Sequence, residues 1–370
     1  MSHVPGDALH ARLLTTHAGG PLLAGNRLRW WRERQAAEAA ICAAIDGACH
    51  QVQVAQAWQR DRRLRGLVAD RLRACVARGV TVRQWPLPTH LLHLLAAQAS
   101  GWWHGGDAGW LLVVDGCHAF VGGVEPPRRS PRHATMRAAE LPAVLSVQGP
   151  AAAALAEAQG LDGTVTSTLA PLPPALGRQR VAVGLRPRRG RAAVAHPFVR
   201  ALEGAVRQAQ HRVWLRSAAF APSPGLFAAM ADAARRGVDT RLMLRHEVAA
   251  WLPASAARWL LAPLAEAGVR LHPLPPGEAP ARIALVDGQW CGLGTADLGW
   301  CGSRGGRGVE LVVLDSHFAA ELEARYVVDA ARCGDAHHLA SRPRPLPGGA
   351  PASSPAPTPG RRTVQRGPQR

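Results

Sequence analysis

The sequence predicts an α/β protein made of two similar halves. Three blocks occur twice in the same order: ACHQVQV (48–54) and AQHRVWL (209–215), ARGVTVR (77–83) and RRGVDTR (235–241), LLVVDGCHAFVGG (111–123) and IALVDGQWCGLG (283–294). Ordered recurrence of this kind indicates an internal duplication. Strand patterns alternate with helical patterns in each half, and this alternation favours a mostly parallel sheet flanked by helices. We expect the two halves to pack about a pseudo-twofold axis.

The periodicity of apolar residues places the same elements in each half. We expect helices at 36–47, 64–78, 198–208 and 225–236, and strands at 52–57, 80–85, 213–219 and 238–244. The second helix of each half should end at Gly79 or Gly237, because glycine adopts the left-handed conformation at a helix C-terminus. The apolar runs before Asp115 and Asp287 fit strands that are buried on both faces. A further helical stretch is expected at 251–264, in the longer connection of the second half.

The duplication also suggests the division into domains. We expect an N-terminal segment at 1–21, a first domain at 22–175, a second domain at 176–335 and a tail at 336–370. From Ser341 onward the tail contains six arginines, no acidic residue and many prolines, so it cannot bury a core and should be disordered.

Charge and composition limit the classes of function. The chain has a formal net charge of +18 and contains no lysine, so all 44 residues of the Lys and Arg class are arginine. A basic protein favours anionic partners, although a codon bias towards arginine also explains part of this excess. Chemistry that requires a lysine is excluded.

Other sequence signals are absent. No run of 18 apolar residues predicts a membrane-spanning helix, and the N-terminus lacks the pattern of a signal peptide. Seven cysteines without a CxxC pair are typical of a reducing compartment, so we expect a cytoplasmic protein without cofactor. Cys333 with His337 and His338 lacks a second ligand pair, so no metal site is predicted.

The blocks and their order resemble those of bacterial cardiolipin synthases, which belong to the phospholipase D superfamily. The blocks that carry the resemblance are GNRLRWW (25–31), RGVTVR (78–83), VVDGCHAFVGG (113–123) and VQGPAAAAL (147–155) in the first half, and SAAFAPSPGL (217–226), RRGVDTRLML (235–244), LVDGQWCGLGTADL (285–298) and GVELVV (308–313) in the second. The resemblance covers about residues 22–332.

The resemblance implies a motif, His-x-Lys-x4-Asp, in each half. In that family one histidine attacks phosphorus, the other protonates the leaving alcohol, and the lysines hold phosphate oxygens. Counting back from Asp115, the histidine position is Ala108 and the lysine position is Trp110. Counting back from Asp287, these positions are Pro280 and Arg282. Only the aspartates match, and an Asp-Gly turn also explains their presence.

The resemblance leaves half of a phosphate site in the second half of the chain. Arg282 replaces the lysine, and a guanidinium binds phosphate through two parallel hydrogen bonds. Thr295 and Asp297 lie where the family has Gly-Ser-x-Asn, and Glu310 matches the family's downstream glutamate. His104 is the candidate for a relocated catalytic histidine beside Asp115 and Asp287. His118 and His272 are weaker candidates of the same kind.

A segment near the N-terminus alternates arginine and tryptophan: Arg29, Trp30, Trp31 and Arg32. Tryptophan and arginine favour the headgroup region of an anionic membrane, so we expect these residues to contact lipid and the protein to lie peripherally on the inner membrane. A simpler explanation is that Trp30 and Trp31 cover the edge of the first strand. The pair Trp102 and Trp103 could flank a lipid entrance.

The sequence therefore predicts a protein related to cardiolipin synthase, whose family reaction is phosphatidyl transfer between phospholipids. We expect impaired catalysis and binding of phosphate or anionic phospholipid, with an intact paralogue as a further partner. Two alternatives stay open: an active phosphodiesterase or phosphatidyltransferase that uses relocated histidines, and a non-catalytic nucleic-acid binder. Arginine with aromatic residues also suits single strands, but no nucleic-acid-binding module is recognisable, so nucleic acid is the less expected partner.

Overall fold

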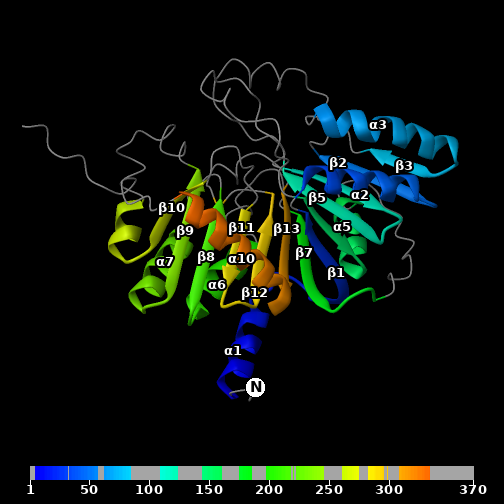
Figure 1. Ribbon diagram of the computed structural model, residues 1–370. Coiled ribbons are helices and arrows are strands. Elements are labelled where there is room, and N and C mark those ends of the chain that lie inside the picture. Colours follow the sequence, from blue (N-terminus) through cyan, green and yellow to red (C-terminus); the bar gives the residue numbers. More distant parts are fainter. Residues whose placement is uncertain are drawn as a thin grey trace, which may run out of the picture.

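The computed structural model of the 370-residue chain describes residues 5–31, 33–56, 62–84, 109–123, 144–160, 175–185, 197–217, 220, 222–245, 261–274, 282–295, 298 and 308–333. Figure 1 shows one long twisted sheet with helices on both of its faces. The sheet has 13 strands in the order β10-β9-β8-β11-β12-β13-β7-β1-β6-β5-β4-β2-β3. Both halves of the chain therefore contribute to a single sheet.

The strands of the first half are β1 (Leu23–Trp31), β2 (Gln51–Gln56), β3 (Thr81–Gln84), β4 (Gly109–Val114), β5 (His118–Gly123) and β6 (Val144–Gln148). Those of the second half are β7 (Gln179–Leu185), β8 (Arg212–Ser217), β9 (Asp239–Arg245), β10 (Arg270–Leu274), β11 (Arg282–Val286), β12 (Trp290–Gly294) and β13 (Val309–Leu314). The helices are α1 (Pro5–Thr16), α2 (Arg34–Asp46), α3 (Arg62–Ala77), α5 (Pro150–Gly160), α6 (Pro197–Gln208), α7 (Pro224–Arg235) and α10 (Ser316–Cys333).

Strand pairing repeats between the halves. In the first half β2 pairs with β3 in parallel and with β4 antiparallel, and the ladder continues antiparallel through β5 and β6 to β1. In the second half β8 pairs with β9 in parallel and with β11 antiparallel, and the ladder continues antiparallel through β12 and β13 to β7. The antiparallel pair β1–β7 joins the two series.

The prediction of a mostly parallel sheet was wrong. Only β2–β3, β8–β9 and β9–β10 are parallel pairs, and the other pairs are antiparallel. The reason lies in the turns at Asp115 and Asp287, which reverse the chain within three residues and join β4 to β5 and β11 to β12 as hairpins. A connection this short can join only antiparallel strands. Apolar runs buried on both faces do not distinguish the two cases, because helices cover both faces of this mixed sheet.

Three apolar clusters form the core. Alternation along β4 sends Leu111 and Val113 to one cluster and Leu112 and Val114 to another. The first of these clusters lies under α5 and α10 and contains residues of both halves. On the opposite face, α2 and α3 cover the cluster of the first half, and α1, α6 and α7 cover that of the second. The shared cluster is the main contact that unites the halves.

Most local predictions were confirmed. Helices α2, α3, α6 and α7 and strands β2, β3, β8 and β9 lie within a few residues of their predicted ranges. Gly79 and Gly237 follow α3 and α7 with φ of 81° and 86°, as a left-handed helix end requires. The expected helix at 251–264 falls mostly outside the described residues, and its last part is helical at 261–266. Helix α1 was not predicted.

Candidate phosphate site at the motif positions

The two motif aspartates make matching contacts with the backbone. Asp115 follows β4, and its carboxylate accepts hydrogen bonds from the backbone N–H groups of Cys49 (2.9 Å), His50 (2.8 Å) and Gln51 (2.8 Å). Burial alone would raise the pKa of Asp115, but these hydrogen bonds outweigh it and the pKa is lowered. The carboxylate thereby fixes the start of β2 beside the end of β4.

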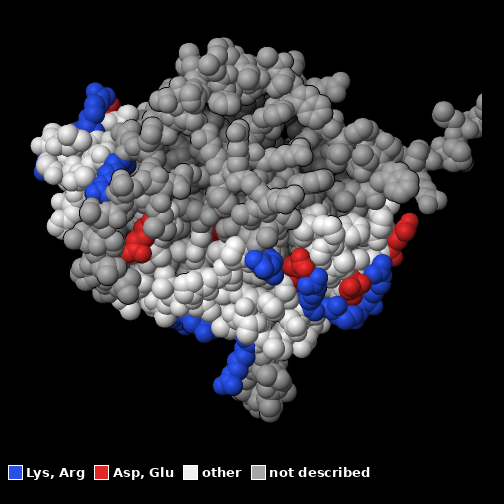
Figure 2. All heavy atoms as spheres, turned by 180° about the vertical axis from the view of Figure 1, so that it is seen from behind, with Lys and Arg blue, Asp and Glu red and all other residues white. Residues whose placement is uncertain are grey.

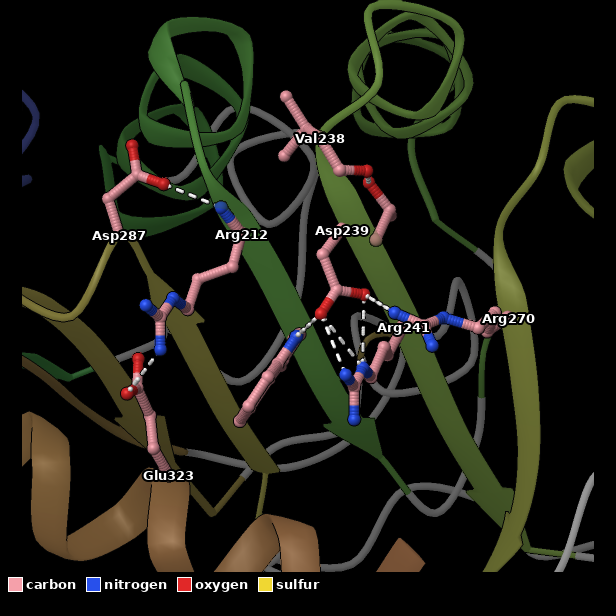
Figure 3. Close-up of polar contacts among 9 residues, drawn as sticks. Arg212, Val238, Asp239, Arg241, Arg270, Asp287 and Glu323 are labelled. Atoms are coloured by element: carbon pink, nitrogen blue, oxygen red, sulfur yellow. Dashed lines mark hydrogen bonds and ion pairs between the residues drawn. The ribbon is translucent and has the colours of Figure 1, made fainter.

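Asp287 repeats this arrangement in the second half. Its carboxylate accepts from the backbone N–H groups of Gln210 (2.8 Å), His211 (2.8 Å) and Arg212 (2.7 Å) at the start of β8, the last of which is visible in Figure 3. Both aspartates have positive φ, 48° and 51°, a region that aspartate tolerates better than most residues. The matching geometry shows that both aspartates organise the hairpin turn.

Asp287 has one additional partner that the sequence did not reveal. His10 on α1 places Nε2 2.6 Å from Oδ2 of Asp287, and both side chains are buried. The indole Nε1 of Trp290 also donates to the backbone carbonyl of His17, at 2.8 Å. These two contacts attach α1 to the turn that joins β11 to β12. Because His10 and Asp287 are 277 residues apart, no local sequence pattern predicts the contact.

Arg212 links the same turn to α10. Its backbone N–H binds Asp287, and its guanidinium Nη1 donates to Oε2 of Glu323 at 3.0 Å (Figure 3). The pKa of Glu323 is raised because burial outweighs the attraction of Arg212, and the charge of Asp287 adds to the effect. The polar contacts at this end of the sheet therefore connect α1, β8 and α10.

The position that corresponds to the lysine of the motif, here called the cation position, lies at the opposite end of the strand from the aspartate. Arg282 is the first residue of β11 and Asp287 follows its last residue, so about 16 Å of strand separates them. Asp287 therefore cannot touch a phosphate bound at Arg282. The same holds for Asp115 and Trp110 across β4.

Arg282 forms a buried ion pair with Glu310. Both residues pair with Gly294 on the central strand β12, so their side chains project from the same face on either side of a residue without a side chain. The guanidinium and carboxylate meet above Gly294, where a Cβ atom would collide with both. Arg282 is 3% exposed and Glu310 is fully buried. Nη2 of Arg282 also donates to the carbonyl of Leu293, at 3.3 Å.

Thr295 extends this site by one residue. Its hydroxyl oxygen accepts a hydrogen bond from the N–H of Val309 at 3.0 Å, and its own N–H donates to the carbonyl of Val309 at 3.1 Å. The predicted residues Arg282, Thr295 and Glu310 thus lie together at the ends of three adjacent strands. Their side chains are buried, and the cation already has an acidic partner.

The equivalent site of the first half is apolar. By strand register, Trp110, Gly122 and Val144 correspond to Arg282, Gly294 and Glu310. The indole of Trp110 lies over Gly122, where it fills the space that a Cβ atom would need, and it is 1% exposed. Its Nε1 has no hydrogen-bond partner among the described residues. This half therefore offers neither a cation nor a carboxylate at the corresponding position.

The tryptophans expected to contact membrane are half-buried. Alternation along β1 directs Trp30 towards the shared core and Trp31 towards the core under α2 and α3. Trp31 donates its indole N–H to Oγ of Ser146 at 3.0 Å, and the guanidinium of Arg29 lies 3.9 Å from the centre of a Trp31 ring. Arg29 itself is exposed.

Several residues named in the sequence analysis fall outside the part of the chain that the structure describes: Arg32, Trp102, Trp103, His104, Ala108, Pro280, Asp297, His337, His338 and the tail. His118 lies on β5 beside Phe120, and His272 is buried on β10. Neither histidine lies on β11, β12 or β13, which carry Arg282, Thr295 and Glu310.

A second polar cluster, at the outer edge of the sheet, was not predicted. Asp239 accepts from Nε1 of Trp214 at 3.1 Å, from Arg241 at 2.8 Å and from Arg270 (Figure 3). Burial would raise the pKa of Asp239, but these donors lower it. The RGVDTR block contains two of the participants, whereas Arg270 comes from β10 and could not be inferred from spacing. The cluster ties β8, β9 and β10 together.

No group of residues suited to a metal ion occurs in the described parts of the chain. No helix among the described residues is long and apolar enough to cross a membrane.

Comparisons with known proteins agree on the family. Residues 202–327 match the family model described as "Cardiolipin synthase, PLD-like domain". Cardiolipin synthase A of Pseudomonas aeruginosa LESB58 is 30% identical over 231 residues, which cover 60% of this chain and 46% of that protein. Cardiolipin synthase A of Pseudomonas fluorescens SBW25 is 31% identical over 138 residues, covering 37% and 29%.

A solved structure extends the similarity of the fold to nearly the whole chain. Phosphatidylserine synthase of Haemophilus influenzae Rd KW20 superposes with a TM-score of 0.62 and 12% identity, covering 89% of this chain and 92% of that chain. The chain is therefore similar to proteins of the phospholipase D superfamily, and within it to the cardiolipin synthases, although it spans less than half the length of those it matches.

Proposed function

We propose that this chain is a cardiolipin synthase-like protein that binds phosphate or an anionic phospholipid headgroup and does not transfer phosphatidyl groups by the family mechanism. The observation that carries the proposal is the state of the two cation positions. Trp110 is a buried indole packed on glycine, and Arg282 is a buried guanidinium already paired with Glu310. Ala108 and Pro280 stand at the histidine positions and provide neither a nucleophile nor a proton donor.

Arg282 is the residue that would hold phosphate. A guanidinium binds a phosphate through two parallel hydrogen bonds, and the hydroxyl of Thr295 on the adjacent strand could donate a third. The carboxylate of Glu310 occupies the same guanidinium. A phosphate must therefore replace this carboxylate, and removing an acid from a buried pair costs free energy. This competition favours weak and exchangeable binding.

The architecture we infer is two phospholipase D-like repeats, at 22–175 and 176–335, related by a pseudo-twofold axis. The repeated pairing order around β1–β7 supports it, as does the pair of aspartates with three matching backbone contacts each. The two cation positions would then be related by the axis.

An anionic membrane surface is the partner we propose, with an intact paralogue as a second. The net charge of +18 supports an anionic partner. Figure 2 shows acidic side chains interleaved with basic ones at the lower right of the described surface. Exposed arginines such as Arg73 and Arg235 have acidic neighbours. The arginine clusters at 128–137 and 186–191 and in the tail lie outside the described residues. We assign the attraction to those clusters together with Arg29, Arg32, Trp30 and Trp31.

Two measurements test catalysis and binding separately. Purified full-length protein incubated with labelled phosphatidylglycerol should give no cardiolipin, and no phosphorylated histidine should be trapped by acid-free quenching. Binding of inorganic phosphate, measured by calorimetry, should be strengthened about tenfold by Glu310→Gln, because the neutral amide competes less for Arg282. Arg282→Gln should abolish it, and Arg73→Gln, which removes an exposed charge, should not. A trapped phosphohistidine would show that the proposed loss of catalysis is wrong.

Membrane binding has its own test. Sedimentation with vesicles of phosphatidylglycerol, but not of phosphatidylcholine, should remove the protein from solution, and 1 M salt should reverse it because screening weakens charge attraction. If Trp30→Ala with Trp31→Ala leaves sedimentation unchanged, the arginine clusters alone account for it. Equal competition by single-stranded DNA at physiological salt would favour a nucleic-acid binder instead.

A further inference from the structure

Helix α10 has an apolar stripe on its outer side as well as a largely apolar inner side. Its inner face, with Phe318, Leu322 and Tyr326, is buried in the core shared by the two halves. Its outer face is an exposed stripe made of Ala320, Ala324, Val327, Val328 and Ala331. Val327 and Val328 are 46% and 48% exposed, which is unusual for branched side chains at adjacent positions of a surface helix. No arginine, aspartate or glutamate interrupts the stripe; Ser316 and His317 lie at its N-terminal end.

The stripe follows the repeat of an α-helix. Ala320, Ala324, Val327 and Ala331 are spaced by four, three and four residues, and Val328 lies four residues after Ala324. The stripe therefore follows one side of α10 for about three turns. A surface helix ordinarily presents charged or polar residues outward, so an apolar stripe on the outer side of α10 departs from the usual pattern. Figure 1 shows α10 in front of the sheet, with no other described element across its outer side. The stripe is therefore a docking surface that lacks a partner within the described chain.

The charged residues beside the stripe are arranged so that one copy of α10 can pair with a second copy. Glu321 and Arg332 lie on the same flank of α10, about 20° apart around the helix axis. They are 11 residues apart, or about 16 Å along the axis, near opposite ends of the stripe. The midpoint between them lies next to Tyr326, and so does the midpoint between Ala324 and Val328. A twofold axis perpendicular to α10 at this point would superpose the stripe on itself.

We propose that α10 docks against α10 of a second copy of this chain, antiparallel, across a twofold axis beside Tyr326. A twofold axis in this orientation keeps residues of one flank on the same side of the helix pair. Glu321 then faces Arg332 of the partner subunit, and Arg332 faces Glu321 of the partner subunit. A parallel pair would bring opposite flanks together and lose both contacts. The interface is therefore self-complementary in apolar surface and in charge.

The size of the side chains favours a second helix over a lipid surface. Because alanine and valine are small, the axes of two such helices can lie at the short end of the usual interaxial distance of roughly 8–10 Å. Helices that bind membranes present large residues such as tryptophan, phenylalanine and leucine, and this stripe has none. One helix pair buries less than the roughly 1,600 Å² of a standard interface, so the dimer should dissociate in the micromolar range.

Sedimentation equilibrium of the full-length chain over micromolar concentrations tests the proposal. Wild-type protein should be a reversible dimer, and the double variant Val327→Glu/Val328→Glu should be monomeric, because four carboxylates would be buried in the interface. Val76→Glu is the matched control, since Val76 is 61% exposed on α3, away from the stripe. Circular dichroism of each variant establishes that the monomers are folded.

A charge exchange tests the orientation of the two helices. Glu321→Arg and Arg332→Glu should each weaken the dimer by about tenfold, because like charges then face each other twice. The double variant should return to within about threefold of wild type, because the attraction is restored with exchanged signs. A wild-type protein that stays monomeric, a Val327→Glu/Val328→Glu variant that still dimerises, or additive effects of the two exchanges would each refute the proposal. If the wild type is monomeric and the Val327→Glu/Val328→Glu variant loses binding to phosphatidylglycerol vesicles, the stripe belongs to membranes instead.

Discussion

Asp115 and Asp287 perform the same task in the two halves of the chain. Each binds three consecutive backbone N–H groups at the start of the neighbouring strand, from a residue with positive φ. This task does not involve Trp110 or Arg282, which lie at the other end of the strand that precedes each aspartate. The presence of the aspartates therefore does not by itself indicate activity.

Replacing Asp287 should weaken folding more than replacing Asp115. Asp287→Ala leaves three partly buried N–H groups and the buried His10 without their acceptor, so we expect the free energy of unfolding to fall by about 3 kcal/mol. Asp115 is more exposed, and Asp115→Ala should cost about 2 kcal/mol. Asn at either site keeps one acceptor and tolerates positive φ, so it should cost about half as much. Urea denaturation measures the difference; equal losses for Ala and Asn would contradict this account.

The ion pair of Arg282 and Glu310 should be strongly non-additive. Arg282→Met or Glu310→Leu alone leaves the opposite charge in the core and should cost about 3–5 kcal/mol. The double variant removes both charges and should cost much less than the sum. A double-mutant cycle by chemical denaturation gives the coupling energy. Additive losses would mean that the two side chains are not coupled in solution.

His10→Leu should release α1 from the second half. The substitution removes the contact with Asp287 but retains an apolar side chain of similar size. We expect faster hydrogen exchange in α1 and at the amides of Gln210, His211 and Arg212, since Asp287 loses one constraint. Arg12→Leu, on the exposed side of α1, should leave these rates unchanged. Unchanged exchange in the His10 variant would show that other contacts hold α1.

His118 should make the protein sensitive to acid. Burial lowers the pKa of His118 to about 4 from an ordinary value of 6.5. Between these values the unfolded chain binds a proton that the folded chain does not, so stability falls as pH decreases from about 6.5 to about 4. His118→Phe should flatten this decline, because phenylalanine suits the contact with Phe120 and does not titrate.

The measurement for His118 is the free energy of unfolding as a function of pH, with His317→Phe on α10 as the exposed control. NMR titration of the His118 ring gives the pKa directly. A midpoint near 6.5 would disprove the role assigned to burial.

Local features of the fold followed from the sequence, and long-range contacts did not. Gly79 and Gly237 predicted where α3 and α7 end, and the repeated blocks predicted the equivalent strands of the two halves. The direction of pairing was missed because the Asp-Gly turns were interpreted only as strand ends. An Asp-Gly pair between two apolar runs also predicts a hairpin, and this signal was present at both sites.

The sequence grouped three residues of the candidate site that the structure brings together, while their binding of phosphate stays a prediction. Arg282, Thr295 and Glu310 were identified by the spacing of the family motif, and they lie together. The ion pair between Arg282 and Glu310 depends on the register of β11, β12 and β13, which brings residues 28 apart in sequence to either side of Gly294. Motif spacing carries no information on that register. The contact between His10 and Asp287 depends on the docking of α1, which composition alone does not predict.

The indole of Trp110 over Gly122 limits which side chains can occupy the cation position of the first half. A lysine or arginine in place of Trp110 would leave a hollow against bare backbone and would introduce a charge with Val144, not an acid, across from it. A cation there needs a carboxylate or a ligand to stabilise it, so placing one at this position requires coordinated changes on β4, β5 and β6. A single substitution of Trp110 would therefore destabilise the fold, and the packing of the indole fixes the apolar character of this site.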